Sequence, residues 1–561
     1  MQSVVSAIQQ YVRAMVERVS GMKVLLVDEE TTGIVSLVFS HSQILEHEVF
    51  LVERIDSKEK ERMRHLHALC FLRPTNKNFV ELSKELKNPH FGEYHLFFTN
   101  VIPQGRLEQL AACDEFEVVH QVQEFFADVF AFDHELFTLN MPMTSGLLRD
   151  PWSTLERALF TRTVEGIFSL MVALRMRPSI RYTAQFDLTQ KVAQDLTERM
   201  SKHGDLFDKQ GRGEAQHTVL ILDRREDPVT PLLNQWTYQA MLHELIGIEN
   251  HRIDMRKAPG IRPDLREIVM SPEQDSFYRD NRFSNFGDLG TNIGVYVEEY
   301  QKQTANTCKI ESIEDMQRFV DDYPEFRKLS GNVSKHVAVV HELSRLVEQH
   351  DLMSVSSVEQ ELACTEARQE QRDAVRERLQ SSSISNMERL RLVLLFALRY
   401  ETDAASLKRM KEDLREHSVG EAEIEFIDKV VQYAGVSVRG GDLFQNKGMF
   451  KQFTNTLTKN LKGVENVYTQ HKTHLHSVLD SMSRGKLKES SYPFACGQSN
   501  AAAREHHVLV FMVGGTTYEE FRDVEAINTA CGTSFHVVLG GSTVHNSKSF
   551  LADVAQLSRP E

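Results

Sequence analysis

The sequence predicts an α/β protein with a large helical insertion. Short, nearly continuous apolar runs alternate with amphipathic segments over residues 1–135. Helical periodicity dominates from about residue 250 to residue 480, and apolar runs followed by glycine pairs return after residue 508. Alternating strands and helices are typical of parallel sheets, whereas a long stretch with a 3.6-residue period is typical of helical packing. The 561 residues suffice for several domains.

The first region reads as a Rossmann-like domain, residues 1–135. Apolar side chains recur at helical spacing over residues 4–19, and residues 79–86 form a second amphipathic segment. Between and after them lie runs that are typical of strands buried on both faces, at residues 22–28, 49–52, 68–72 and 94–98. This alternation of strands and helices predicts a parallel, doubly wound sheet.

Sheets of this kind often bind nucleotides at the carboxyl ends of their strands. Here the strand at residues 22–28 is followed by Glu29 and Glu30 and not by a glycine-rich turn. Two carboxylates repel a pyrophosphate, so we expect no dinucleotide site in this half of the chain.

The second α/β domain is predicted to be discontinuous, comprising residues 136–248 and 480–561. Residues 219–223 (VLILD) form a clear strand, and residues 508–513 and 536–539 resemble it in type. The simplest arrangement returns the end of the chain to the sheet that contains residues 219–223. Residues 249–479 then form a mainly helical inserted domain, with a long helix at residues 326–347.

Composition and charge exclude several classes of function. The net charge of −15 gives no reason to expect nucleic acid as a partner. No apolar run approaches the roughly 20 residues of a membrane helix, and charged side chains interrupt the start of the chain where a signal peptide would be apolar. The six cysteines include no C-x-x-C pair. We therefore expect a cytoplasmic protein without a cysteine-based zinc site.

Catalytic and metal-binding motifs are incomplete. Three segments, beginning at His134, His243 and His341, start like the zinc-protease pattern H-E-x-x-H, but each lacks the second histidine. His471, His474 and His476 place only two ligands on one helical face. We therefore expect no metal, no cofactor and no enzymatic activity.

One enzymatic alternative stays open on the sequence. Gly514-Gly515 and Gly540-Gly541 each follow an apolar run and could cradle a phosphate group. Asp223 and Asp227 flank the end of another strand, where catalytic carboxylates often lie. The alternative function is a phosphate-handling α/β enzyme that uses these loops and carboxylates. Against it, neither glycine pair matches a phosphate-binding loop with its lysine, and glycine pairs also permit tight strand–helix packing.

Several blocks spread over the chain resemble one family. They are residues 220–248 (LILDRREDPVTPLLNQWTYQAMLHELIGI), 323–346 (YPEFRKLSGNVSKHVAVVHELSRL), 463–471 (GVENVYTQH), 513–520 (VGGTTYEE) and 538–548 (VLGGSTVHNSK), together with residues 22–55. The chain is similar in these blocks to the Sec/Munc (SM) family of SNARE-binding fusion proteins, and most similar to its endosomal branch.

The resemblance implies a three-domain arch around a central cleft, with no catalytic activity. It implies that the chain binds a syntaxin-like Qa-SNARE and assembled SNARE complexes. Such a protein is monomeric alone, and is cytoplasmic and peripherally associated with trans-Golgi network and endosomal membranes through its SNARE. Its function is to promote SNARE complex assembly for vesicle docking and fusion.

The resemblance also implies two binding surfaces. An apolar pocket on the first domain accepts the N-terminal peptide of the syntaxin, and the matching region is residues 104–130. We expect its residues to lie on two short helices: Leu107 and Leu110 on the first, and Val122, Phe125, Phe126 and Val129 on the second. A template for SNARE helices is expected on the polar face of the 326–347 helix, at Lys328, Lys335, His336 and Glu342.

Overall fold

The protein forms two compact units in a computed structural model that describes residues 2–208, 215–307, 313–440, 443, 468–498 and 505–558. The side chains of residues 299–330 lie outside this description. The first unit comprises Met1–Arg224, Leu479–Thr516 and Val524–Val544. The second comprises Arg225–Val478, Thr517–Asp523 and His545–Glu561.

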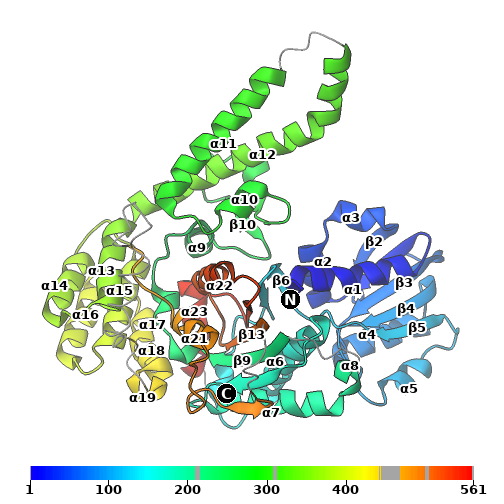
Figure 1. Cartoon of the computed structure of the whole chain (residues 1–561), viewed down its shortest axis with the longest axis horizontal. Coiled ribbons are helices and arrows are strands. Elements are labelled where there is room, and N and C mark those ends of the chain that lie inside the picture. The colour runs from blue at the N-terminus through cyan, green and yellow to red at the C-terminus, as the bar shows by residue number, and fades with distance from the viewer. Residues whose placement is uncertain are drawn as a thin grey trace. The chain divides into compact units, whose positions relative to one another are not determined.

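The first sheet of the first unit has five parallel strands in the order β2-β1-β3-β4-β5 (Figure 1). The strands are β1 (Lys23–Val27), β2 (Val49–Arg54), β3 (Met63–Leu72), β4 (Phe91–Phe98) and β5 (Val119–Glu124). The accompanying helices are α1 (Val4–Arg18), α2 (Glu29–Val38), α3 (His41–Glu46), α4 (Asn76–Lys87) and α5 (Arg106–Ala111). The parallel sheet, its first four strands and helices α1 and α4 are therefore confirmed.

Strand alternation divides this sheet into two differently packed faces. Leu96 on β4 and Leu110 on α5 belong to one buried apolar cluster together with Phe79 and Leu82 of α4. Neighbouring residues of a strand point to opposite faces. Phe97 therefore lies on the other face, where its ring is 4.9 Å from that of Phe125.

The second sheet of the first unit has seven strands in the order β12-β8-β9-β13-β14-β7-β6. They are β6 (Phe130–Asp133), β7 (Leu136–Thr138), β8 (Ser179–Tyr182), β9 (Ala215–Asp223), β12 (Phe494–Cys496), β13 (Glu505–Val513) and β14 (Phe535–Gly541). Strand β13 lies between β9 and β14 and is parallel to both. The predicted return of the chain's end to the 219–223 strand is therefore confirmed.

Other helices of the first unit are α6 (Thr154–Ala173), α7 (Asp187–Lys202) and α8 (Asp205–Asp208). Strand β6, which the sequence assigned to the end of the first domain, pairs in the second sheet with β7. Both sheets belong to one compact unit. The three-part division of the chain stays a prediction.

The glycine pairs permit close backbone packing. A side chain at Gly540 would meet the ring of Phe137 on β7 at 2.0 Å, and one at Gly541 would meet the backbone nitrogen of Thr516 at 2.9 Å. Gly514 and Gly515 have φ values of 86° and 90°, which favour glycine. Packing and turn geometry therefore account for all four glycines.

The second unit is mainly helical, as predicted. Its helices include α9 (Tyr238–Met241), α10 (Ser276–Asn281), α11 (Phe286–Thr307), α12 (Ile313–Gln349), α13 (Leu352–Cys364), α14 (Arg368–Leu379), α15 (Asn386–Arg399), α16 (Ala404–Glu416), α17 (Glu421–Ile424), α18 (Phe426–Ala434), α19 (Val436–Arg439) and α23 (Ser547–Val554). Further elements of the chain are the strands β10 (Arg252–Asp254) and β11 (Glu267–Val269), and the helices α21 (His474–Ser483) and α22 (Tyr518–Cys531).

The two longest helices, α11 and α12, lie side by side and extend away from the other helices of the second unit (Figure 1). The predicted 326–347 helix lies within α12, so that prediction is confirmed. Among the helices of the described residues, none is both long and apolar enough to span a membrane.

Candidate functional site

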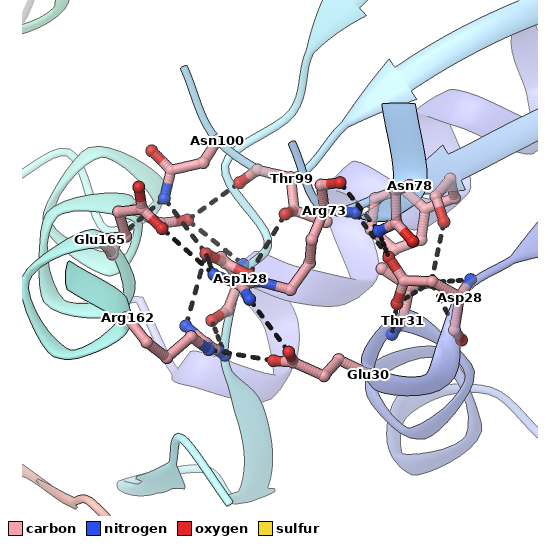
Figure 2. A network of polar contacts seen from close by, with 12 residues as sticks. Asp28, Glu30, Thr31, Arg73, Asn78, Thr99, Asn100, Asp128, Arg162 and Glu165 are labelled. Carbon is pink, nitrogen blue, oxygen red and sulfur yellow. Dashed lines mark hydrogen bonds and ion pairs between the residues drawn. The ribbon is translucent and has the colours of Figure 1, made fainter. Parts of the chain in front are cut away.

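The carboxyl edge of the first sheet is occupied by the protein's own side chains. Chain connectivity reverses direction between β1 and β3, which is where sheets of this class bind nucleotides. Asp28 directly follows β1 and caps α2. Its carboxylate accepts hydrogen bonds from the Thr31 N–H (2.8 Å), the Arg73 N–H (2.7 Å) and Asn78 Nδ2 (2.6 Å) (Figure 2).

Arg73, which directly follows β3, extends this network (Figure 2). Its guanidinium contacts Asp128 (Nε–Oδ1, 2.8 Å), Glu30 (Nη1–Oε1, 2.9 Å) and Glu165 (Nη2–Oε2, 3.2 Å). Arg162 on α6 contacts the same Glu30 at 2.9 Å and the same Asp128 at 3.4 Å. Two arginines thus form ion pairs with three carboxylates at the edge where sheets of this class bind nucleotides.

Asp128 is the fully buried centre of this network. Burial by itself raises the pKa of Asp128, but Arg162 and Arg73 outweigh it and hold the pKa below its ordinary value. Asp128 is therefore ionised at neutral pH. The two arginines are thus already paired with a carboxylate of the chain, and an anionic ligand at this edge would have to displace these ion pairs.

The structure does not support the phosphate-handling alternative. Asp227 accepts hydrogen bonds from the N–H groups of Val229 (3.1 Å), Thr230 (3.0 Å) and His474 (3.0 Å). Its carboxylate therefore shapes a turn. Asp223 is only 3% exposed, and the glycine pairs serve close packing.

Two of the six residues predicted to line the peptide pocket are exposed. Leu107 on α5 is 48% exposed and Val122 on β5 is 38% exposed, whereas Leu110 is buried in the cluster beneath α5. Val122 pairs with Leu96, and paired residues of neighbouring strands share a face. Val122 therefore lies on the face of the sheet whose core includes Leu110.

The second predicted helix of this region is wrong. Residues Val119–Glu124 form strand β5, and Phe125, Phe126 and Val129 follow it in the core. The Phe125 ring lies 5.4 Å from that of Tyr11, and the Phe126 ring 6.3 Å from that of Phe168. These three side chains hold the fold and do not present a surface to a peptide.

A pocket of about 270 Å³ lies between α4 and α5. Its residues are Phe79, Val80, Ser83, Lys84, Lys87, Arg106, Gln109 and Leu110. Apolar side chains contribute to it together with three cations, so it favours a ligand that is both apolar and acidic. The α4 side of the pocket was not among the residues predicted from the sequence. The only available signal was the spacing of Val80, Lys84 and Lys87, which lie on one helical face.

The predicted template face of α12 is partly wrong. His336 is completely buried and Glu342 is 6% exposed, so neither lies on an exposed polar face. Lys335 forms an ion pair with Asp275 and donates a hydrogen bond to the Val269 carbonyl oxygen (3.1 Å). The side chain of Lys328 lies outside the described residues.

His336 and Glu342 are buried because each has polar partners inside the second unit. His336 contacts the Tyr238 hydroxyl through Nδ1 and Asp275 through Nε2, both at 2.8 Å. Arg345 pairs with Glu342 through two hydrogen bonds of 2.6 and 2.7 Å. These polar side chains therefore stabilise the helix packing.

Nearly the whole chain is similar to known proteins of one family. A family model described as the Sec1 family matches residues 23–553. Vacuolar protein sorting-associated protein 45 of Rattus norvegicus is 46% identical over 556 residues, which cover 98% of this chain and 96% of the relative. The protein of the same name from Dictyostelium discoideum is 43% identical over 559 residues, 99% and 98% of the two chains.

The fold is also similar to that of solved structures. The SM protein Vps45 in complex with the Qa SNARE Tlg2 is similar with a TM-score of 0.90 and 43% identity, covering 99% of this chain and 98% of that chain. An Unc18–syntaxin 1 complex from Monosiga brevicollis, at 20% identity and full coverage of both chains, has the same fold with a TM-score of 0.81. These matches confirm the resemblance that the sequence blocks indicated: the chain belongs to the Sec1 family.

Proposed function

We propose that this chain binds a syntaxin-like Qa-SNARE and promotes SNARE complex assembly for vesicle docking and fusion at trans-Golgi and endosomal membranes. The observation that carries the proposal is the near-complete structural match to the SM protein Vps45 in complex with the Qa SNARE Tlg2. The chain reaches membranes through its SNARE and is monomeric alone. Residues 1–135 provide the peptide-binding domain, residues 136–248 with 480–561 the discontinuous domain, and residues 249–479 the templating domain.

The surface around α5 is the proposed site for the N-terminal peptide of the SNARE. Leu107 and Val122 offer exposed apolar area, and the adjacent pocket between α4 and α5 adds Phe79 and the cations Lys84 and Arg106. Apolar contact provides affinity, and the cations favour a peptide with an acidic side chain. Leu110 supports this surface from beneath.

Helix α12 is the proposed template for a SNARE helix. Its proposed contact face is the one formed by side chains that are exposed in the structure. Val337 is 43% exposed and His341 is exposed on the following turn, whereas His336 and Val339 face inward. An apolar side chain on the exposed face of a long helix suits contact with a heptad helix, because such helices pack through apolar positions. Holding two SNARE helices in register lowers the entropic cost of starting the zipper.

The test is capture of a syntaxin N-terminal peptide by the Leu107→Arg variant. Placing a guanidinium in apolar contact costs several kcal/mol when it has no partner, so we expect at least a tenfold loss of affinity without a change in melting temperature. Leu155→Arg is the matched control, because Leu155 is a 65% exposed leucine on another helix of the same unit. Equal affinity of wild type, Leu107→Arg and Leu155→Arg would remove α5 from the binding surface.

A further inference from the structure

Histidines line one end of three neighbouring strands in the first sheet. His67 lies on β3, Glu93 and His95 on β4, and His120 on β5. Glu93 pairs with His67 across the strands, and the rings of His67 and His120 lie 6.1 Å and 5.9 Å from that of His95. The proposed function makes no use of this group.

The ligand-type atoms of the group converge on Glu93. His67 Nδ1 is 2.9 Å from Glu93 Oε2, His95 Nε2 is 3.8 Å from the same oxygen, and His120 Nε2 is 3.6 Å from Glu93 Oε1. One atom each from His67, Glu93 and His95 lies within 4.8 Å of the other two. Within the described part of the chain, these three residues form the one His/Cys/Asp/Glu group with this geometry.

Several of these atoms lack the hydrogen bonds that buried polar atoms normally make. The side chain of His95 is only 12% exposed, and neither of its ring nitrogens has a hydrogen-bond partner among the described residues. His67 Nδ1 also has none, although Glu93 is near, because that contact lacks hydrogen-bond geometry. An unsatisfied buried polar atom destabilises a fold, so a bound partner for these atoms is expected.

We propose that His67, Glu93 and His95 form a binding site for a divalent transition metal ion of the Zn²⁺ class, with His120 positioned to add a fourth ligand. Imidazole nitrogens and a carboxylate are the donors that such ions prefer. Bonds of about 2.0–2.1 Å in tetrahedral geometry place ligand atoms about 3.3 Å apart. The observed separations of 2.9 Å and 3.8 Å from Glu93 Oε2 to the nitrogens of His67 and His95 lie on either side of that spacing.

Burial also suits His95 to this role. The ring nitrogens of His95 lie inside the fold without a hydrogen-bond partner among the described residues, so one of them is available to a metal ion. A bound cation would bond one ring nitrogen each of His67 and His95 and balance the charge of the Glu93 carboxylate. It would also link β3, β4 and the edge strand β5.

The metal site and the peptide surface lie on opposite faces of the sheet. His95 precedes Leu96, and Leu96 belongs to the core beneath α4 and α5. Successive strand residues point to opposite faces, so the imidazole of His95 points away from that core. Metal binding and peptide capture can therefore fail independently, which separates this inference from the proposed function.

The second sheet provides a matched control. Three histidines, His217, His507 and His536, lie on the adjacent strands β9, β13 and β14. The ring centroid of His507 is 5.5 Å from that of His217 and 6.2 Å from that of His536. Their ligand atoms do not form a convergent group of the kind found around Glu93 in the described residues. Replacing His217 therefore removes a histidine from a similar row without removing a proposed ligand.

The experiment titrates the chelator-treated full chain with Co²⁺, which absorbs strongly in the visible range when tetrahedral, and then displaces it with Zn²⁺. We expect wild type and His217→Gln to bind one equivalent with the tetrahedral spectrum. His95→Gln and Glu93→Gln should each weaken that binding at least tenfold, and Zn²⁺ should raise the melting temperatures of wild type and His217→Gln but not those of these two variants. Glu93 is 39% exposed, so Glu93→Gln retains the fold if His95→Gln does not.

Melting temperatures without metal show whether each variant is folded. Peptide capture by folded His95→Gln and Glu93→Gln should equal that of wild type. The proposal is overturned if wild type shows no tetrahedral Co²⁺ spectrum, or if folded Glu93→Gln binds the ion as tightly as His217→Gln. Binding by all variants alike would indicate ordinary surface histidines.

Discussion

Asp275 and His336 form a buried hydrogen bond of 2.8 Å that joins the start of α10 to the middle of α12. The same histidine contacts the Tyr238 hydroxyl, and Asp275 also caps α10 through the Tyr278 N–H (3.0 Å). Burial raises the pKa of Asp275, but His336 and Lys335 outweigh it and hold the pKa well below its ordinary range. One ionised carboxylate thus links α10 to the middle of α12, the longest helix among the described residues.

Removing that carboxylate should destabilise the second unit. Asp275→Ala leaves Lys335 and His336 without their shared partner, and breaking a buried ion pair in this way costs about 3–5 kcal/mol. We expect this loss in the free energy of unfolding in urea, together with faster hydrogen exchange in α10 and α12. Asp280→Ala, at a 64% exposed position of the same helix, should change stability by no more than about 0.5 kcal/mol. Equal stability of the two variants would contradict the assignment.

Charge reversal at Lys335 should act on stability and not only on partner binding. The Lys335 side chain is 13% exposed and pairs with the nearly buried Asp275, so Lys335→Glu places two carboxylates together. We expect a loss of about 3 kcal/mol or more, and a smaller loss for Lys335→Met. Thermal unfolding of both variants measures the difference. Unchanged melting of Lys335→Glu would show that the ion pair is unimportant.

A substitution at Val337 tests the proposed template face of α12. Because Val337 is 43% exposed, Val337→Asp should change stability by only about 0.5 kcal/mol. The same substitution should slow SNARE assembly on liposomes several-fold, because it places a charge in an apolar helix contact. Val436→Asp, at a 45% exposed valine of α19, is the control. Assembly at the wild-type rate by Val337→Asp would place the template elsewhere.

The ionic network at the edge of the first sheet should make a large contribution to stability. Asp128→Asn keeps the shape of the side chain but leaves Arg73 and Arg162 without its charge, so we expect a loss of about 3 kcal/mol. Denaturant unfolding followed by circular dichroism measures it. Glu198→Gln, at an exposed position of α7, should be close to neutral. A neutral result for Asp128→Asn would mean that the two arginines find other partners.

Two histidines of β13 should make the fold sensitive to acid. Burial lowers the pKa of His506 to about 4, with Arg181 adding to the effect, and burial likewise lowers the pKa of His507 to about 4. Their ordinary pKa is about 6.5. Below that pH the unfolded chain takes up protons that the folded chain does not, so stability is complete above pH 6.5 and falls as the pH approaches 4.

The measurement is the drop in melting temperature between pH 7 and pH 5 for wild type and for the His506→Gln, His507→Gln double variant. The variant should lose less, because it lacks the two groups that resist protonation. An equal drop in both proteins would assign the acid sensitivity to other groups.

The sequence was sufficient for the parallel sheet because its strands are continuous apolar runs that cannot be solvated on either face. It failed at β5. Val122, Phe125, Phe126 and Val129 follow the spacing of an amphipathic helix, yet residues Val119–Glu124 pair with β4. Hydrogen bonding to an open sheet edge overrode the local pattern, and local patterns do not report on such edges.

The face of α12 was misjudged for a different reason. Polarity placed His336 and Glu342 on the solvent side, but both are buried and the neighbouring Val337 is exposed. The polar partners that make this burial possible, Tyr238 and Asp275, lie far away in sequence. The group around Glu93 was likewise invisible, because its residues come from three strands that only the folded sheet brings together.

The position of β13 has a consequence for synthesis of the chain. Strand β9 ends at residue 223, but its neighbour β13 begins at residue 505, after the whole helical insertion. On the ribosome, one edge of β9 therefore stays unpaired while the second unit is translated. An apolar strand with an open edge readily pairs with other chains. This edge of β9 is covered only once β13 has been translated, so the nascent chain has to avoid edge-to-edge pairing throughout synthesis of the helical insertion.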